Sequence, residues 1–595
     1  MATFASGFIR PGVYVKQTAG PGAAQLPSSF ISALIGQGSD RFTIFSKQIV
    51  STGPATDDIL DSDRNVAAIT GVRLNNIDQL SYCSILHTSN QGIPFNTVAP
   101  KIHWSANKPA AGVSYYVTYI AYKNPLAHDY DVALVSDLNT HLNYYGAAVQ
   151  ASHEIVNGNN LLNAISMGAD IEKNNGATSW YAAQLNPFNE TTLSTAAAVA
   201  TVTGAVGTTG ATGTVFTVNL NGDGAQSVSV AAGITGANLA EYLLQAVHAL
   251  TATNPALQAA YDYFDVDYIG GSNTFIVYSG MAGSNSSVVV TGTALTGGTP
   301  AVGTGPTMFD LTDEAGLLTA LQQVLAKLEL LDAWVIIPCF PAIIGGINAS
   351  LVPVIDAHVA AMRDIATQKW RVALLGAQQG TDTGTNPETK YINTATAMGS
   401  NALGVVAPST AVYTYNGLDF TLDGWSIAAA VAGVMTNPVY GAGEPIAGKN
   451  LVGFSSIKDV FNTTQKNTMG TAGVLMIDNE IGVPAIIQDL TTDQSNAVNS
   501  QFKFTRAADY VAKSLRLILR KLYINTNNLG DATMSNIGSS IKMILQQMVW
   551  LHIINDFSDP QVAKNGSDPR QVDVVVSIQL VPDVTWIYVN LGVNL

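Results

Sequence analysis

The chain has 595 residues, of which 47% are hydrophobic and only 12% charged, and its formal net charge is −15. This length allows about three domains with cores of their own, and the low charge content indicates neutral surface of the kind that subunits bury against one another. The acidic balance argues against a general nucleic-acid binder, which needs basic surface to neutralise phosphate.

Targeting and redox signals are few. Two cysteines, Cys83 and Cys339, exclude a disulfide framework and a thiolate zinc site, so we expect reduced core residues of a protein that folds in a cytosol. The first residues lack a basic region followed by an apolar run, and no signal peptide is predicted. Apolar runs such as 427–435 are too short to cross a bilayer, which predicts a soluble protein.

The chain begins with a short strand-like arm. Pro11 and Gly12 predict a turn, and the β-prone residues 13–15 follow before a linker rich in Gly, Ala and Pro. The apolar run 30–35 predicts the first core strand.

Two segments of different composition follow. From 46 to 190 the pattern is mixed, with a helix expected over 136–151, which indicates a first α+β domain. Between Lys173 and Lys327 there is no lysine or arginine, and Gly, Thr, Ala and Val dominate. Two hairpin signals and a helix within this stretch predict a small ββαββ module at 191–306.

From residue 310 helices and strands alternate. We expect helices at 314–331, 351–368 and 425–435, and strands at 334–338, 371–375 and 403–406. This alternation predicts a mostly parallel sheet flanked by helices. Two long helices are expected at 500–523 and 534–554.

The carboxyl-terminal stretch contains two strand patterns. Alternate apolar residues run from Val572 to Leu580, Pro582 and Asp583 predict a turn, and a second alternation continues to Leu595. A flat hydrophobic terminal strand has unpaired backbone groups. It therefore completes a sheet of its own chain or adds to a sheet of another chain.

No constellation of catalytic or metal-binding residues is recognisable. Residues 443–449, GEPIAGK, have the spacing of a phosphate loop, but Pro445 removes one N–H donor and Asn450 stands where Ser or Thr would hold Mg²⁺. The S-x-x-K spacing at 539–542 lies on a predicted helix without its partner motifs.

A basic stripe is predicted on the helix at 500–523. It consists of Arg506, Asp509, Lys513, Arg516 and Arg520, at steps that place them on one helix face. Two interpretations remain open: a solvated face that pairs with nearby carboxylates, or a docking surface for an acidic partner.

Four stretches carry a family resemblance when they are taken in order. They are PGVYVKQ followed by SSFISALIGQGSD, DGWSIAAAVAGVMTNPVYGAGEP at 423–445, a strand pair that ends IIQDLTTD, and RAADYVAKSLRLILRKLYIN with the terminal strands. The chain thereby resembles the contractile tail sheath proteins of bacteriophages and related injection machines. The resemblance is good for the arms and the carboxyl-terminal half, loose up to residue 189, and nearly absent in the lysine-free insert.

The resemblance implies an α/β fold. It comprises a discontinuous core domain with a mixed, largely parallel sheet flanked by helices, two inserted β-rich (α+β) protruding domains and extended terminal strand arms. The expected parts are an amino-terminal arm at 1–28, a core of 29–45 with 310–582, a first insert at 46–190, a Gly/Thr-rich β insert at 191–306 and a carboxyl-terminal arm at 583–595.

The resemblance also implies a function. The protein would be a structural subunit without enzymatic activity that polymerises as stacked rings of six around a tail tube, and contracts to drive the tube through the host envelope. Its partners would be further copies, the tail tube protein, and baseplate and tail terminator proteins. No cofactor, nucleic acid or membrane insertion is implied, and the protein would lie in the phage tail after assembly in the host cytoplasm.

Particular residues would serve these contacts. The amino-terminal arm would pair with neighbours through Gly12, Val13, Tyr14, Val15 and Lys16, and the carboxyl-terminal arm through Trp586, Ile587, Tyr588, Val589, Leu591, Val593 and Leu595. The residues that face the tube would be Arg506, Lys513, Arg516 and Arg520.

Two alternatives come from other classes of function. An α/β scaffold also suits a hydrolase or a nucleotide-binding enzyme, because the fold does not dictate the function. The Thr/Gly-rich insert suggests a phage surface or adhesion protein.

Overall fold

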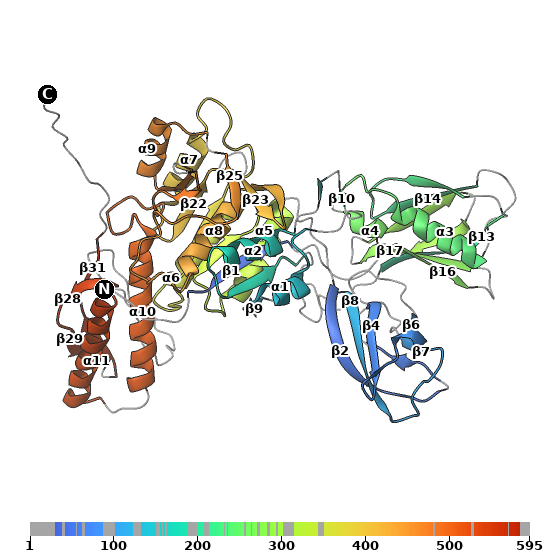
Figure 1. The fold of residues 1–595 in the computed structure, drawn as a ribbon, viewed down its shortest axis with the longest axis horizontal. Helices are drawn as coiled ribbons and strands as arrows, with labels where there is room; N and C mark the ends of the chain where they lie inside the picture. The colour runs from blue at the N-terminus through green and yellow to red at the C-terminus, as the bar shows by residue number, and fades with distance from the viewer. Residues whose placement is uncertain are drawn as a thin grey trace.

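An eight-stranded sheet is the largest element of this computed structural model (Figure 1). Its strands, in spatial order, are β27 (Ala485–Ile486), β26 (Val474–Asp478), β22 (Leu403–Ala407), β21 (Val372–Gly376), β20 (Val335–Pro338), β1 (Ser32–Gly36), β12 (Trp180–Gln184) and β9 (Ala133–Val135). All neighbours from β26 to β12 are parallel, and antiparallel partners, β27 and β9, close the edges. The predicted mixed, largely parallel sheet is therefore confirmed.

The remaining elements lie around this sheet. Figure 1 shows α10 and α11 on one side of it and the strands from β13 to β19 on the opposite side.

The structure describes residues 30–37, 42–54, 56–61, 66–86, 101–122, 132–149, 155–156, 159–160, 163–186, 199–206, 214–230, 233–234, 236–254, 257–262, 264–269, 274–282, 286–292, 295–301, 314–342, 350–458, 460–479, 482–524, 529–568 and 570–582.

Helices flank the sheet, and one of them is fully enclosed. They are α1 (Leu138–Tyr145), α2 (Ala164–Asn174), α5 (Glu314–Leu328), α6 (Leu351–Arg363), α7 (Thr389–Met398), α8 (Trp425–Thr436) and α9 (Thr463–Thr471). Every residue of α8 is buried, because its sequence is almost entirely small or apolar. Gly433 lets α8 approach α2 closely, since a Cβ at this position would lie 2.6 Å from the carbonyl oxygen of Glu172.

The predicted boundary of the first insert at residue 190 needs correction. β9, α1, α2 and β12 lie between residues 133 and 184, yet they belong to the eight-stranded sheet and its hydrophobic core. β12 pairs in parallel with β1, with Trp180 opposite Ser32. This pairing joins segments far apart in the sequence, so no local pattern could indicate it.

Residues 42–122 form two antiparallel sheets. The four-stranded sheet has the order β2 (Phe42–Val50), β8 (Ser114–Tyr122), β4 (Val66–Leu74) and β5 (Ile77–Asp78). The three-stranded sheet has the order β3 (Asp58–Ile59), β7 (Lys101–Trp104) and β6 (Cys83–Leu86), and the short 3-10 helix Leu80–Tyr82 precedes β6. Side chains such as Leu60, Ile102 and Tyr115 form a hydrophobic cluster of their own.

Residues 199–301 contain the predicted hairpins and helix together with further strands. The elements are β13 (Val199–Val206), β14 (Thr214–Leu220), β15 (Gln226–Val230), α3 (Gly236–His248), α4 (Gln258–Asp262), β16 (Asp265–Ile269), β17 (Thr274–Ala282), β18 (Val288–Gly292) and β19 (Leu295–Ala301). Positive φ angles at Asn221 and Gly222 form the turn between β14 and β15, as the sequence predicts. β13, β18 and β19 were not predicted. Gly and Thr obscure the alternation of β13 and β19, whereas β18 begins with three consecutive valines and has no alternation to detect.

The carboxyl-terminal elements pack around a hydrophobic cluster of their own, which includes Val511, Ile541 and Leu545. These elements are α10 (Phe502–Tyr523), α11 (Asp531–Trp550), β28 (Ile554–Phe557), β29 (Gln561–Lys564), β30 (Val572–Val575) and β31 (Ile578–Leu580). Both long helices thus lie where the sequence predicts them. The single strand pattern from Val572 to Leu580 is divided, because β30 pairs with β29 whereas β31 pairs with β28.

Two small sheets complete the described structure. One is β24 (Leu418–Asp423), β23 (Thr410–Tyr415) and β25 (Phe454–Ile457), and the other is β10 (Ile155–Val156) with β11 (Asn159–Asn160). Among the helices within the described ranges, none combines the length and the apolar character that a bilayer crossing requires.

Candidate assembly interface

The predicted arm residues lie outside the part of the chain that the structure describes. These are Gly12, Val13, Tyr14, Val15 and Lys16 at one end, and Trp586, Ile587, Tyr588, Val589, Leu591, Val593 and Leu595 at the other. The described structure does, however, contain a strand pair directly before the carboxyl-terminal arm.

This strand pair, β28 with β31, is a two-stranded antiparallel sheet. Ile554 of β28 and Ile578 of β31 are 1% and 3% exposed, because both pack against α10 and α11. Within the described ranges each strand has one hydrogen-bonded neighbour, which leaves one backbone edge of each strand open. Open edges of this kind are templates for further strands.

Arg506 does not have the predicted exposed position on α10. It is only 1% exposed, and its Nη2 donates a hydrogen bond to the carbonyl oxygen of Tyr440 at 2.8 Å. Its guanidinium also lies 5.2 Å from the ring centre of Phe30. Burial lowers its pKa to about 10. The prediction that Arg506 faces the tube is therefore corrected: helical spacing places residues on one face but does not show whether that face is covered.

Asp509, the acidic member of the stripe, connects α10 to the core. Its carboxylate accepts hydrogen bonds from the Trp334 indole at 2.8 Å and from the two terminal nitrogens of Arg363 at 2.8 and 2.6 Å. The Asp509 side chain is 1% exposed and that of Arg363 13%. A bidentate pair of this kind fixes orientation as well as position.

The other basic residues of the stripe extend from this buried pair to solvent. Lys513 forms an ion pair with Asp332 at 2.6 Å, and Arg516 donates to the carbonyl oxygen of Gln368. Arg520, near the end of α10, is exposed. Of the two interpretations of the stripe, pairing with carboxylates applies to Lys513, whereas the covered part of the stripe docks α10 onto the core.

A second buried cation lies next to this contact. Arg371 is fully buried, and its Nη2 donates to the Leu331 carbonyl oxygen at 2.6 Å. Its Nη1 lies 2.8 Å from Nε2 of His358. Burial and then the charge of Arg371 lower the pKa of His358 to about 4, so the neutral imidazole accepts this hydrogen bond. No local sequence pattern indicates this cluster, because its members come from different elements.

The outer face of α11 and Leu551, the residue that follows the helix, carry exposed apolar side chains. Met543, Trp550 and Leu551 are 66%, 74% and 53% exposed. Their spacing of seven and eight residues places them on one helix face. Exposed apolar groups of this size are typical of surfaces that a partner covers.

The phosphate-loop spacing at 443–449 does not form a phosphate site. The backbone N–H groups of Gly448 and Lys449 donate to the carbonyl oxygens of Ile486 and Ile446. The Lys449 ammonium lies 4.1 Å from the ring centre of Tyr440. The groups that would cradle a phosphate are thus used within the chain.

The two side chains of the S-x-x-K spacing also bond within the chain. Ser539 donates to the Ser535 carbonyl oxygen, and Lys542 pairs with Asp559 at 2.7 Å. Across the described ranges there is no group of three or more His, Cys, Asp or Glu side chains arranged to hold a metal ion.

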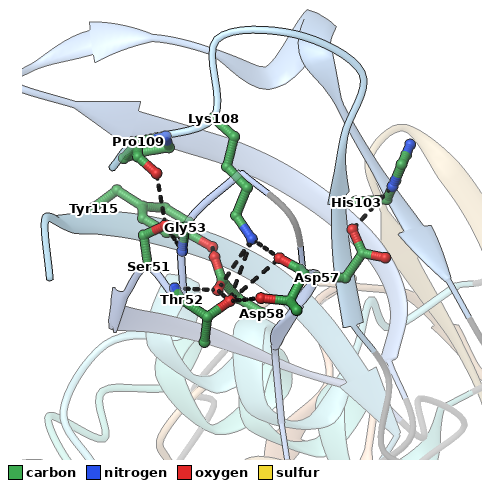
Figure 2. A network of polar contacts seen from close by, with 10 residues as sticks. Ser51, Thr52, Gly53, Asp57, Asp58, His103, Lys108, Pro109 and Tyr115 are labelled. Carbon is green, nitrogen blue, oxygen red and sulfur yellow. Dashed lines mark hydrogen bonds and ion pairs between the residues drawn. The ribbon is translucent and has the colours of Figure 1, made fainter. Parts of the chain in front are cut away.

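Figure 2 shows a cluster of titratable side chains between β3 and β8. Asp58 accepts hydrogen bonds from the Thr52 backbone, the Thr52 hydroxyl and the Tyr115 hydroxyl at 2.7, 2.6 and 2.7 Å, and it pairs with Lys108 at 3.2 Å. Burial alone would raise the pKa of Asp58, but these hydrogen bonds lower it below its ordinary value. Because these groups satisfy one another, the cluster stabilises the sheet.

The carboxyl-terminal part of the chain is similar to a known protein family. Residues 494–594, which include α10, α11 and the small strand pairs, match the family model of the phage tail sheath C-terminal domain. This match confirms the resemblance seen in the sequence. No curated protein matches the chain.

Several solved structures are similar at low identity. A sheath tail protein from Listeria innocua is 14% identical over 76% of this chain and 89% of its own, with a TM-score of 0.41. A sheath tail protein from Desulfitobacterium hafniense is 13% identical over 71% and 89%, with a TM-score of 0.38. The contracted helical sheath of the anti-feeding prophage is 14% identical over 49% and 78%, with a TM-score of 0.35. These values are low, so the relationship depends on the carboxyl-terminal match.

Proposed function

Because residues 494–594 place this chain in the phage tail sheath family, we propose that it is a structural subunit of a contractile tail sheath. Copies stack as rings of six around a tail tube, and contraction drives the tube through the host envelope. Further partners are baseplate and tail terminator proteins, and the protein lies in the tail of a phage or phage-like particle. Catalysis has no part in this proposal.

The division into domains is also a proposal, with boundaries adjusted to the observed sheets. Residues 30–36, 132–186 and 314–490 form the core that moves as one body. Residues 42–122 and 199–301 are inserts that project from it. The separate hydrophobic clusters of the two inserts support this division, as does their position beside the large sheet in Figure 1.

The terminal arms connect neighbouring copies. Residues 12–16 and 586–595 add strands to the open edges of β28 and β31 in adjacent subunits, where main-chain hydrogen bonds give affinity. The position of β31 directly before the carboxyl-terminal arm supports this arrangement. Contraction is then a change between two packings of the same subunits, and it requires no nucleotide.

The connecting role of the carboxyl-terminal arm can be tested by microscopy of the purified full-length chain. Replacing Val589 and Leu591 by proline removes two strand N–H donors without shortening the chain. We expect the wild type to form tubes or rings and the proline variant to remain monomeric and folded. A matched variant with threonine at both positions keeps the donors and should still assemble. Tubes formed by the proline variant would exclude the proposed strand pairing.

The tube contact is proposed for the exposed end of the stripe. Lys513 and Arg516 already bond within the chain, so Arg520 is best placed to reach an acidic tube surface. We expect Arg520→Glu to weaken co-assembly with tail tubes most at low salt, where charges are least screened. Lys542→Glu, on the exposed surface of α11, is the control. Equal assembly of both variants at high and low salt would contradict the contact.

A further inference from the structure

A polar hollow opens on one face of the four-stranded sheet β2-β8-β4-β5. Its volume is about 380 Å³, and its lining comprises Ser46, Thr70, Arg73, Asn76, Tyr116 and Thr118 around Gly71. These residues alternate along the strands with Val72, Tyr115 and Val117, which are buried in the cluster on the opposite face. The hollow therefore lies on the outer face of the sheet, away from its hydrophobic core.

Gly71 creates the space at the centre of this hollow. It lies opposite Thr118, where the pairing of β4 and β8 shifts register. A Cβ at this position would meet only the Thr118 side chain, at 3.6 and 3.8 Å, so a larger residue would fit sterically. Glycine inside a strand weakens the strand, and it often marks a place where a ligand approaches the backbone.

The floor of the hollow is held in place from the other side of the sheet. Tyr115, the neighbour of Tyr116 on β8, donates its hydroxyl to Asp58 at 2.7 Å within the network of Figure 2. Asp58 in turn pairs with Lys108, whose side chain is only 6% exposed. Buried satisfied networks of this kind make a strand rigid, so the hollow is formed before any ligand binds.

The lining combines three kinds of group. The hydroxyls of Ser46 and Thr118 and the amide of Asn76 can both donate and accept hydrogen bonds, and the Thr70 hydroxyl, which donates to the Thr118 carbonyl oxygen at 3.2 Å, can accept one. Tyr116 is 55% exposed and presents an aromatic surface, on which the C–H face of a sugar ring can pack. Arg73, which lies opposite Tyr116 on β8 and opposite Asp78 on β5 in the strand registers, supplies one positive charge, and the residues that line the hollow include no carboxylate.

We propose that this hollow binds an acidic saccharide unit, with sugar hydroxyls on the polar side chains and a carboxylate or phosphate substituent on Arg73. Guanidinium groups bind both anions through paired hydrogen bonds, so the site chemistry does not separate the two. The proposal goes beyond the role of a sheath subunit and does not depend on assembly or contraction.

Calorimetric titration of the full-length protein tests this proposal. The probes are a galacturonate oligomer, which carries carboxylates, a glycosylated glycerol phosphate oligomer, and neutral dextran. We expect one or both acidic probes to bind and dextran to bind at least about tenfold more weakly, equivalent to about 1.4 kcal/mol. Absence of binding by both acidic probes, or equal affinity for dextran, would overturn the proposal.

Two variants locate the binding to the hollow. Gly71→Val fills the space with a residue that strands accept, and we expect binding of the acidic probe to fall at least about tenfold. Arg73→Gln should reduce acidic binding by a similar factor. Val50→Thr, at an exposed position of β2 outside the hollow, is the matched control and should bind as the wild type does.

Folding and assembly are measured on the same variants. Unchanged circular dichroism and thermal midpoint of Gly71→Val would show that lost binding is not lost folding. Tubes of unchanged appearance by microscopy would show that saccharide binding and assembly are separate properties, because the variant would have lost the first and kept the second. Full binding by a folded Gly71→Val variant would show that the saccharide binds elsewhere and would exclude the hollow.

Discussion

Replacing Asp509 by alanine is expected to lower the free energy of unfolding by about 3–5 kcal/mol, one of the largest effects of any single substitution in this chain. The substitution leaves the Arg363 guanidinium and the Trp334 indole N–H without the carboxylate that both bind. A buried charge that loses its partner costs several kcal/mol, because water cannot replace that partner. Denaturant unfolding followed by tryptophan fluorescence measures the loss, and Trp334 reports directly on this contact.

Two further variants make this result specific. Lys513→Ala, on the same helix as Asp509, breaks the ion pair with Asp332. The side chain of Asp332 is 53% exposed, so we expect a loss below about 1 kcal/mol. Replacing the pair together, Arg363→Met with Asp509→Leu, should recover most of the stability, because neither charge is then left alone. Equal losses for Asp509→Ala and Lys513→Ala would mean that the buried pair does not anchor α10.

The pH dependence of stability is expected to report on Glu172. This residue of α2 is fully buried, and its Oε2 accepts a hydrogen bond from the Ser32 hydroxyl at 2.7 Å. Among the described residues, its Oε1 has no hydrogen-bond partner. Burial raises the pKa of Glu172 from 4.5 to about 8, although the hydrogen bond from Ser32 acts in the opposite direction. The folded protein therefore keeps this proton at neutral pH, whereas the unfolded chain releases it.

The sign of the effect follows from this difference. Between pH 4.5 and about 8 the folded state holds one proton more than the unfolded state, so the contribution of Glu172 to stability falls as pH rises, by about 1.4 kcal/mol per pH unit. Above pH 8 the loss levels off. Glutamine at position 172 does not titrate. The unfolding free energy of Glu172→Gln minus that of the wild type should therefore increase as pH rises through this window.

Denaturant midpoints at several pH values measure this difference. Glu314→Gln, at an exposed position at the start of α5, is the matched control and should follow the wild-type curve. Parallel curves for Glu172→Gln and the wild type would contradict a buried protonated carboxyl group.

Local patterns predicted much of the core. The alternation of helices and buried strands after residue 310 identified β20, β21, β22 and α8, because each carries its own apolar period. The place of β12 beside β1 was not predictable in the same way, since this pairing depends on contacts between distant segments. β13 and β19 were concealed for a different reason, which is the weak hydrophobic contrast of sequences rich in Gly and Thr.

Side-chain roles were harder to predict than elements. The spacing of the stripe on α10 correctly placed its residues on one face, but it could not show that Arg506 and Asp509 are covered by the core. The hollow beside Gly71 gave no sequence signal either, because its lining comes from three strands and a turn.

The different placement of β1 and β31 has a mechanical consequence. β1 lies between β20 and β12 and is parallel to both, with all five of its residues paired to β12 and four of them paired to β20. Tension on the chain before residue 30 would load these hydrogen bonds in shear, so that many would have to break together. β31 has three residues and a single neighbour in the described sheet, and tension on the chain after residue 582 would meet fewer bonds. Under the same force β31 would detach first, and β1 would remain paired in the core sheet.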